Sequence, residues 1–219
     1  TLGARWYDIE ADLKGSAAGS FGNAGQSTDT NAGNNLDVIF SGDNDTSATD
    51  GFIGKMSLSW TPSDDQLYYV TWSEGFRSGF LNRPGGAGND VYTVPFSYDT
   101  DDVTNYEFGW KLDLLDGNLR LNGDIFFVQV ENLQVGIFDA SITNLFFADN
   151  AADAEIKGIE GDFIWLPSNY SGLTVSGGFS ILDSEITESF ITSFVQEGDA
   201  LAFAPELQLN LQARYEWEL

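Results

Sequence analysis

Polar and apolar residues alternate along most of this chain with a period of two, the pattern of β-strands whose two faces meet different surroundings. Short and long polar connections also alternate between these segments, the short ones being residues 61–66, Asp116-Gly117 and residues 167–172. Short turns on one side and long loops on the other are typical of an antiparallel barrel that crosses an outer membrane. About eight strands are expected, at residues 2–14, 52–61, 67–76, 104–115, 118–131, 154–166, 172–184 and 205–219.

The segment at residues 104–115 shows the alternation most clearly. Glu107, Lys111 and Asp113 share one face of the predicted strand, and we expect this face to point into the lumen. A charge on the lipid face costs about 2–4 kcal/mol at mid-bilayer, so the apolar face must point outward. The residues expected to face outward are Tyr106, Phe108, Trp110, Leu112 and Leu114.

A tight hairpin is expected between residues 104–115 and 118–131. The Asp116-Gly117 dipeptide between them readily adopts the positive φ angles of a short hairpin turn, and alternating apolar residues flank it. The two segments are therefore predicted to pair as antiparallel neighbours.

A soluble β-sandwich also alternates, so it is the alternative fold. The expected strands run about 10–15 residues, whereas strands of soluble proteins usually have about five or six. Aromatic residues also gather near the short turns, where they would form an interfacial girdle. These are Trp60, Tyr68, Tyr69, Trp165, Tyr215 and Trp217. Both features favour an all-β, antiparallel transmembrane β-barrel.

The composition removes most enzyme chemistry. The 219 residues include no cysteine and no histidine, which excludes thiolate nucleophiles, Ser–His triads and most zinc or iron sites. A glycosidase-like carboxylate pair, Glu107 with Glu160 or Glu216, is expected by chance among 34 acidic residues. No catalytic residue and no cofactor are therefore predicted.

The formal net charge of −25 argues against nucleic-acid binding, because phosphates require a basic surface. Many acidic residues fall in the long connections, for example at residues 41–45 and 99–102, and most simply form solvated loops. The first of these connections fails the EF-hand pattern, since Ala48 stands where the turn glycine belongs. No metal site is predicted.

Five segments, in order, resemble the barrel domain of TonB-dependent outer-membrane receptors. They are residues 69–80 (YVTWSEGFRSGF), 103–111 (VTNYEFGWK), 119–135 (LRLNGDIFFVQVENLQV), 150–160 (NAADAEIKGIE) and 204–207 (APEL). The resemblance implies a barrel of about 22 strands with a plugged lumen. Such a receptor imports a scarce nutrient with the help of an energy-transducing, TonB-type protein of the inner membrane.

Residues 1–219 are then expected to be a partial barrel domain, an interior slice. No plug domain and no partner-binding box are visible in the sequence. The final residues, Glu216-Trp217-Glu218-Leu219, also lack the terminal aromatic on which such receptors usually end.

The resemblance places candidate ligand contacts in the second long loop, between Arg77 and Asp102, and its flanks. Arg77 either pairs with acids of the loop or clamps an anionic group of the substrate through two hydrogen bonds. Phe76 and Phe80 either stack on a ligand or cap the barrel rim, and Asn82 completes the candidate set.

The expected function is active transport across the outer membrane of a Gram-negative bacterium, for a scarce nutrient such as a siderophore, a vitamin or a carbohydrate. Expected partners are outer-membrane lipid, the nutrient, and a TonB-type protein acting through the plug, with no nucleic acid. The alternative is a structural or self-assembling surface or fibre protein, extracellular if assembled, or a stand-alone small barrel. An outer-membrane enzyme is disfavoured.

Eight strands from a wider barrel would leave unpaired backbone groups on the first and last strands, which lipid does not tolerate. Three resolutions stay open: further strands outside this chain, closure of the chain on itself, or edge-to-edge association of copies. The partner of the strand near residues 5–13 distinguishes them. Residues 15–50 are expected to form an extracellular loop with little regular structure in its glycine- and asparagine-rich part, because residues 15–20 have almost nothing to bury.

Overall fold

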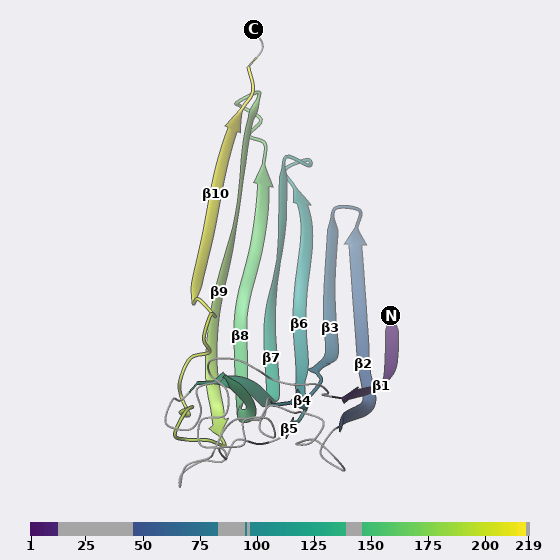
Figure 1. The fold of residues 1–219 in the computed structure, drawn as a ribbon. Helices are drawn as coiled ribbons and strands as arrows, with labels where there is room; N and C mark the ends of the chain where they lie inside the picture. Colours follow the sequence, from purple (N-terminus) through teal and green to yellow (C-terminus); the bar gives the residue numbers. More distant parts are fainter. Residues whose placement is uncertain (13–45, 83–94, 96, 139–145, 218–219) are drawn as a thin grey trace.

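A single layer of antiparallel strands makes up the fold in the computed structural model, which describes residues 1–12, 46–82, 95, 97–138 and 146–217 (Figure 1). The eight-stranded sheet has the order β1-β2-β3-β6-β7-β8-β9-β10, and β4 (Phe80–Leu81) pairs separately with β5 (Ser97–Tyr98). The strands of the large sheet are β1 (Leu2–Asp12), β2 (Thr46–Ser63), β3 (Gln66–Arg77), β6 (Asp101–Leu114), β7 (Leu119–Ile137), β8 (Phe147–Trp165), β9 (Leu173–Ser189) and β10 (Leu207–Tyr215). Among the residues described, no helix is long and apolar enough to cross a membrane.

Each expected segment corresponds to one strand of the large sheet, so the all-β antiparallel fold class is confirmed. The predicted limits were too short at the long-loop ends. Thr46, not residue 52, begins β2, Phe147 begins β8, and β7 and β9 continue to Ile137 and Ser189. The predicted loop at residues 15–50 is therefore wrong for residues 46–50, and residues 13–45 lie outside the described part.

Local packing explains why the alternation did not predict these extensions. Near the long-loop ends, Val130, Ala154 and Ile186 are buried on the face that carries polar residues farther along the strands. Val195 and Leu201, from the β9–β10 connection, pack over them. An apolar cluster on the nominally polar face interrupts the period-two signal there.

The hairpin between β6 and β7 is confirmed, with Leu114 opposite Leu119. Its turn is wider than the predicted dipeptide, because Leu115 also adopts a positive φ of 54°. The Gly117 amide donates to the Leu114 carbonyl at 3.1 Å, and the Asn118 amide donates to the Leu115 carbonyl at the same distance. Asp116 and Gly117, with φ of 55° and 82°, supply the remaining left-handed conformations that close the turn.

Between the short turns and the apolar cluster at the long-loop ends, the strand register separates an apolar face from a more polar face. One row of directly opposed residues on the apolar face runs through Met56, Trp72, Tyr106 and Phe127. Large apolar side chains on this face stay exposed, for example Leu58 at 73% and Leu211 at 75%. Because no second sheet covers them in the described residues, a soluble sandwich is excluded.

The polar face carries the charged residues predicted to point inward. Tyr69, Glu107, Lys111 and Asp113 share it, and Asp113 accepts a hydrogen bond from Arg120 Nε at 2.7 Å. The two faces of β6 are thus divided as predicted. Glu107, Lys111 and Asp113 lie on one face, and the alternate residues lie on the other: Tyr106, Phe108, Trp110, Leu112 and Leu114.

The sheet is open at both edges. In the described part, β1 pairs only with β2 and β10 only with β9, and the two strands end the sheet on opposite sides (Figure 1). Closure of the chain on itself, one of the three expected resolutions, is therefore absent from this structure. The edges remain available to further strands or to other copies.

Several glycines lie under an aromatic ring of the neighbouring strand. A Cβ would lie 2.2 Å from the Tyr69 ring at Gly109, 2.6 Å from the Trp110 ring at Gly123 and 2.6 Å from the Phe126 ring at Gly158. These pairs join β3 to β6, β6 to β7 and β7 to β8. Each ring covers backbone that a glycine leaves bare, a device that fixes the relative position of neighbouring strands.

We therefore expect Gly109→Ala to lower the free energy of unfolding by about 1–3 kcal/mol, because the new methyl collides with the Tyr69 ring. The change is measured by urea unfolding in detergent micelles. The protein used is the full-length native polypeptide that contains this chain.

Gly75→Ala on β3 is the matched control, since nothing lies within 4 Å of its added Cβ. In a Tyr69→Ala background, Gly109→Ala should cost little, because the ring that it strikes is gone. Equal losses for Gly109→Ala and Gly75→Ala would refute the ring-over-glycine account.

Candidate functional site

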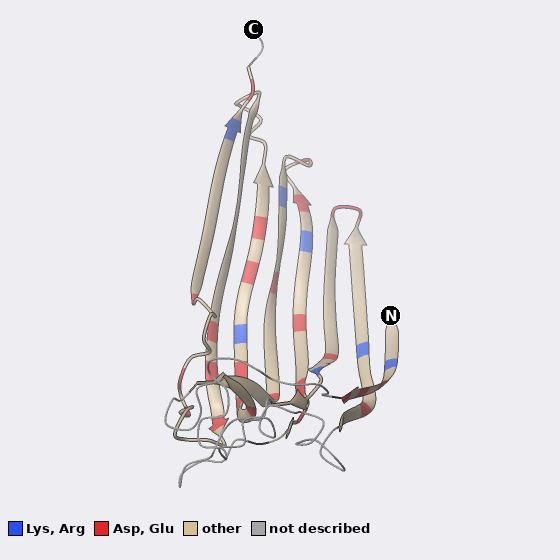
Figure 2. Cartoon of the chain, in the orientation of Figure 1, with Lys and Arg blue, Asp and Glu red and all other residues tan. Residues whose placement is uncertain are grey.

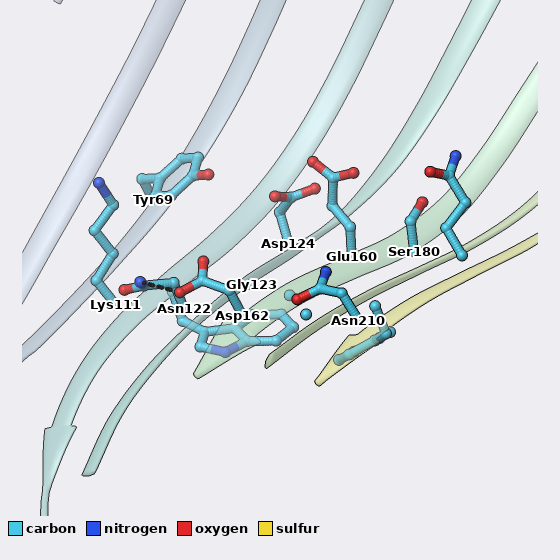
Figure 3. A pocket seen from close by; sticks show the side chains of 14 residues that line it. Tyr69, Lys111, Asn122, Gly123, Asp124, Glu160, Asp162, Ser180 and Asn210 are labelled. Atoms are coloured by element: carbon cyan, nitrogen blue, oxygen red, sulfur yellow. Dashed lines mark hydrogen bonds between the residues drawn. The ribbon is translucent and has the colours of Figure 1, made fainter. Parts of the chain in front are cut away.

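A hollow of about 460 Å³ lies on the polar face and is built by strands far apart in sequence (Figure 3). Asp124 of β7 and Glu160 of β8 are opposite each other in the register and project to the same side as the Tyr69 hydroxyl. That hydroxyl donates to Glu107 Oε1 at 2.6 Å. The polar residues lining the hollow are Tyr69, Lys111, Asn122, Asp124, Glu160, Asp162, Ser180, Gln208 and Asn210.

Acidic side chains outnumber basic ones among the residues that line this hollow, since Asp124, Glu160 and Asp162 face one cation, Lys111. Asn122 Nδ2 donates to Asp162 Oδ2 at 3.0 Å, which fixes one amide at its floor. Acidic residues recur along β6, β7 and β8 (Figure 2). Such a surface suits a partner rich in hydrogen-bond donors or positive charge. Within the described residues, no group of three or more acidic side chains is placed to hold a metal ion.

A second polar site lies at the long-loop end, around Arg77. The last residue of β3, Arg77, is directly opposite Asp101, the first residue of β6. Arg77 Nε donates to Asp101 Oδ2 at 2.8 Å, and Nη2 donates to the same oxygen. The Asp101 carboxylate is only 1% exposed, whereas the Arg77 side chain is 58% exposed. A buried acid therefore holds a guanidinium that still faces solvent.

Gln134 joins the second long loop to β7 at this point. Its backbone amide donates to Asp101 Oδ2 at 3.3 Å, and its carbonyl accepts from Arg77 Nη2 at 3.2 Å. Its side-chain amide donates to the carbonyls of Ser78 and Asp99 at 3.2 and 2.9 Å. One side chain thus binds both ends of the connection between β3 and β6.

Asn150 on β8 extends this network. Its Oδ1 accepts from the Asp99 amide at 2.6 Å, and its Nδ2 donates to the carbonyls of Asp99 and Asn132 at 3.0 and 2.7 Å. Asn132 has a positive φ of 55°, and a register irregularity lies beside it between Val130 and Leu133. This bulge turns the Asn132 carbonyl toward Asn150, so β7 and β8 both help to position the loop.

The described residues of the second loop approach the strand ends closely at Gly79. A Cβ there would lie 2.1 Å from the Tyr98 carbonyl oxygen, so only glycine fits. Leu81 and Asn82, which follow, are each 5% exposed.

The four candidate ligand contacts have different surroundings. Phe76 stacks on Tyr7 of β1 with ring centroids 3.7 Å apart. Phe80 is 38% exposed. Asn82 is buried, and its Nδ2 donates to the carbonyls of Pro95 and Ala148 at 2.9 and 2.7 Å. Its Oδ1 accepts from the Ala148 amide at 2.8 Å, so Asn82 links the loop to β8. Arg77 and Phe80 are therefore the more accessible pair.

Sequence reasoning missed Asp101 as the partner that holds Arg77, because residues 99–102 read as a solvated acidic loop. That interpretation is wrong for Asp101, which is buried. An aspartate at a strand end, one connection away from an isolated arginine, was the available signal. The hollow on the polar face was also missed, since its lining comes from six strands and only the register assembles it.

Electrostatics keep Arg77 charged. The hydrogen bond that Arg77 donates to Asp101 raises the pKa of the guanidinium above its usual value. Next to it, burial, and then repulsion from Asp101 and Glu74, raise the pKa of the Asp102 carboxyl. The two neighbouring acids thus differ: Asp101 pairs with Arg77, while Asp102 lies among like charges.

The family model described as "TonB dependent receptor-like, beta-barrel" matches residues 1–219. The chain belongs to this family. Its open sheet is accordingly a segment of the antiparallel transmembrane barrel of TonB-dependent receptors. Members of the family are transport receptors of the Gram-negative outer membrane.

The chain is also similar to individual TonB-dependent receptors. The chain is 23% identical over 194 residues to the "Probable TonB-dependent siderophore receptor PiuA" of Acinetobacter baumannii, covering 86% of this chain and 22% of that protein. The solved siderophore receptor PiuA from Acinetobacter baumannii has a TM-score of 0.57 at 19% identity, covering 78% of this chain and 24% of that one. The ferric yersiniabactin uptake receptor FyuA from Yersinia pestis has a TM-score of 0.55 at 18% identity, covering 77% and 23%. The chain thus spans less than a quarter of each relative.

We predict that Asn82→Ala frees the Ala148 amide, because this amide donates to Asn82 Oδ1. Loss of such a buried hydrogen bond costs about 1–3 kcal/mol, so exchange of this amide should speed up by roughly 5- to 150-fold. Hydrogen exchange read by mass spectrometry on peptides covering β8 measures it.

Asn118→Ala is the control, since Asn118 Nδ2 donates to the Leu115 carbonyl at the opposite, short-turn end. It should leave β8 exchange unchanged. If Asn82→Ala also leaves β8 unchanged, Asn82 does not hold the loop.

Proposed function

We propose that this chain forms part of the barrel wall of an outer-membrane receptor that actively takes up a scarce nutrient. The apolar face lies against outer-membrane lipid, and the polar face lines the interior. The relatives are more than four times longer than the matched part, so the activity belongs to the whole receptor.

One observation carries this proposal: a single-layer sheet with an exposed apolar face and a polar face. On β6 the apolar face runs from Tyr106 to Leu114 without a charge. A tilted strand needs about 9–11 residues to cross a bilayer, and this stretch has that length. Only lipid on one side and a polar interior on the other satisfy both faces.

The nutrient is proposed to be a siderophore, as the names of the similar receptors suggest, with a vitamin or a carbohydrate as further possibilities. Asp101 has already oriented the Arg77 guanidinium through Nε and Nη2, and a ligand would bind at Nη1. A guanidinium held in this way suits carboxylate or other oxygen-rich groups. Exposed Phe80 adds an apolar surface nearby in sequence, and Phe76 and Asn82 support the rim.

Energy for uptake is proposed to come from a TonB-type protein that acts through a plug domain outside this chain. The hollow on the polar face, with three acids and one lysine in its lining, is where a positively charged surface of such a domain would find partners. The proposed site of action is the outer membrane of a Gram-negative bacterium, and no enzymatic activity is proposed.

Self-association is the second candidate function, because β1 and β10 each leave one edge without a partner in the described part. Copies could join edge to edge into a surface assembly or fibre. The mass of the native polypeptide separates the candidates. A receptor has a mass far above 23.9 kDa, whereas an assembling piece has a subunit of 23.9 kDa.

We expect Leu121→Arg to lower the free energy of unfolding in lipid bilayers by about 2–4 kcal/mol, because Leu121 lies within the apolar face. Its neighbour Asn122 points to the polar face beside Asp162, so Asn122→Arg should be tolerated. Urea unfolding of the receptor in liposomes measures both. Similar losses for the two variants would contradict the assignment of lipid and interior faces.

We expect Arg77→Lys to weaken binding of the cognate ferric siderophore by roughly tenfold, about 1.4 kcal/mol, because the single lysine nitrogen cannot both hold Asp101 as Nε and Nη2 do and present a second nitrogen to the ligand. Arg120→Lys is the matched control. Arg120 clamps Asp113 through Nε at 2.7 Å and Nη2 at 3.0 Å, at the short-turn end of the sheet.

Fluorescence titration of the whole receptor with candidate ferric siderophores gives the two dissociation constants. A loss shared equally by both variants would show a structural effect. No loss for Arg77→Lys would remove Arg77 from the ligand site.

A further inference from the structure

The long-loop ends of β7 and β8 form a short antiparallel segment, residues 133–137 paired with residues 147–152, which we call the loop-end hairpin. It begins beside the bulge at Asn132 and bends away from the direction that the two strands keep along the sheet (Figure 1). Successive side chains of a strand point to opposite faces, so the loop-end hairpin can contact a different connection on each side.

One face of the loop-end hairpin is polar and holds the Arg77 site. Gln134 and Asn150 are opposite each other in the register, and the side-chain amide of each donates to the Asp99 carbonyl. The Gln134 backbone carbonyl accepts from Arg77 Nη2 at 3.2 Å, and its backbone amide donates to Asp101 Oδ2 at 3.3 Å. The hairpin therefore fixes both the guanidinium and the buried acid that pairs with it.

The other face of the loop-end hairpin is apolar and meets the connection between β9 and β10. Ile137 and Phe147 are opposite each other, and each is 4% exposed. Ile191 and Phe194 of that connection pack against them, together with Val135 of β7. The loop-end hairpin is thus held between two connections that are far apart in sequence.

The β9–β10 connection is itself fixed at this point. The Phe194 amide donates to the Ile191 carbonyl at 2.9 Å, which closes a turn that carries both apolar side chains. The Phe190 amide donates to the Ala151 carbonyl of β8 at 2.9 Å, so the chain just before this turn is bonded directly to the loop-end hairpin. Because backbone hydrogen bonds place the turn, Ile191 and Phe194 form a support that is built into the fold.

We propose that Ile191 and Phe194 are positioning residues for ligand binding at Arg77. They hold the loop-end hairpin in place from its apolar face. Gln134, on the opposite face, then holds the guanidinium and leaves its Nη1 to the ligand. This role rests on the proposed contact between Arg77 and the nutrient, and it joins the β9–β10 connection to a ligand site that lies on the other side of the hairpin.

Pre-organisation is the physical reason for this effect at a distance. A guanidinium that is already held by Asp101 and by the Gln134 carbonyl loses little further freedom when it binds an anionic group. Without the Phe194 ring, the apolar cluster loses part of its packing, and the loop-end hairpin opens more easily beside the bulge. Arg77 must then be ordered at the moment of binding, which weakens the affinity.

Hydrogen exchange of the whole receptor, without any siderophore, tests the support directly. Phe194→Ala should speed up exchange of the Gln134 amide by roughly tenfold, because the hairpin opens more often. Phe194→Leu, which keeps an apolar side chain, should restore most of the protection. Phe190→Ala is the matched control, since it removes a ring of the same connection that is 46% exposed and lies outside the cluster. Equally fast exchange in Phe190→Ala, or no change in Phe194→Ala, would overturn the proposal.

Fluorescence titration then uses the ferric siderophore that the unaltered receptor binds most tightly. Phe194→Ala should weaken its binding by roughly tenfold in the unaltered receptor, but by less than about twofold in an Arg77→Lys background, because the support acts only through Arg77. Equal losses in both backgrounds would show that Phe194 acts independently of Arg77 and would overturn the positioning role. Binding of no ferric siderophore would instead overturn the proposed nutrient, while the exchange experiment still decides whether Phe194 supports Gln134.

Discussion

The hydrogen-bonded register between neighbouring strands is the constraint on which the rest of this structure depends. A single-layer sheet has no second layer to bury its apolar side chains, so each residue's face decides whether it meets lipid or the polar interior. Rows such as Met56, Trp72, Tyr106 and Phe127 exist only because four strands hold one consistent pairing. A slip of one residue would place Lys111 and Asp113 on the apolar side. Glycines beneath aromatic rings, as at Gly109 and Tyr69, oppose such a slip through close packing.

Beyond the apolar band, a different kind of stabilisation takes over. The long-loop ends of β3, β6, β7 and β8 are tied by side chains that hydrogen bond to backbone, chiefly Gln134, Asn150 and Asn82. These bonds satisfy carbonyls and amides that leave the strand ladders at the loop entry. Beside them, buried Asp101 orients Arg77. Loop entries that are held in this way can keep their geometry while the residues of the loops vary.

The two open edges connect the shape of the sheet to its place in a larger assembly. Backbone groups on the free sides of β1 and β10 have no partner strand in the described part, and hydrocarbon would not satisfy them. The family match over residues 1–219, together with coverage of less than a quarter of each relative, supports further strands as the completion. The acidic composition fits the same picture, since acids are tolerated in the polar interior and on the loops but not in the apolar band.

The sequence by itself determined the strand content, the β6–β7 hairpin and the division of faces, because a period of two is a local property of each strand. It also singled out Arg77 as an isolated cation at a strand end. Only the tertiary structure decided that Asp101 is buried against Arg77, that Asn82 holds the loop to β8, and that Asp124, Glu160 and Ser180 line one hollow. These contacts join residues that are far apart in sequence, and no pattern in the sequence predicts that they meet. They arise from register and from the bulge near Asn132, which no period along a single strand encodes.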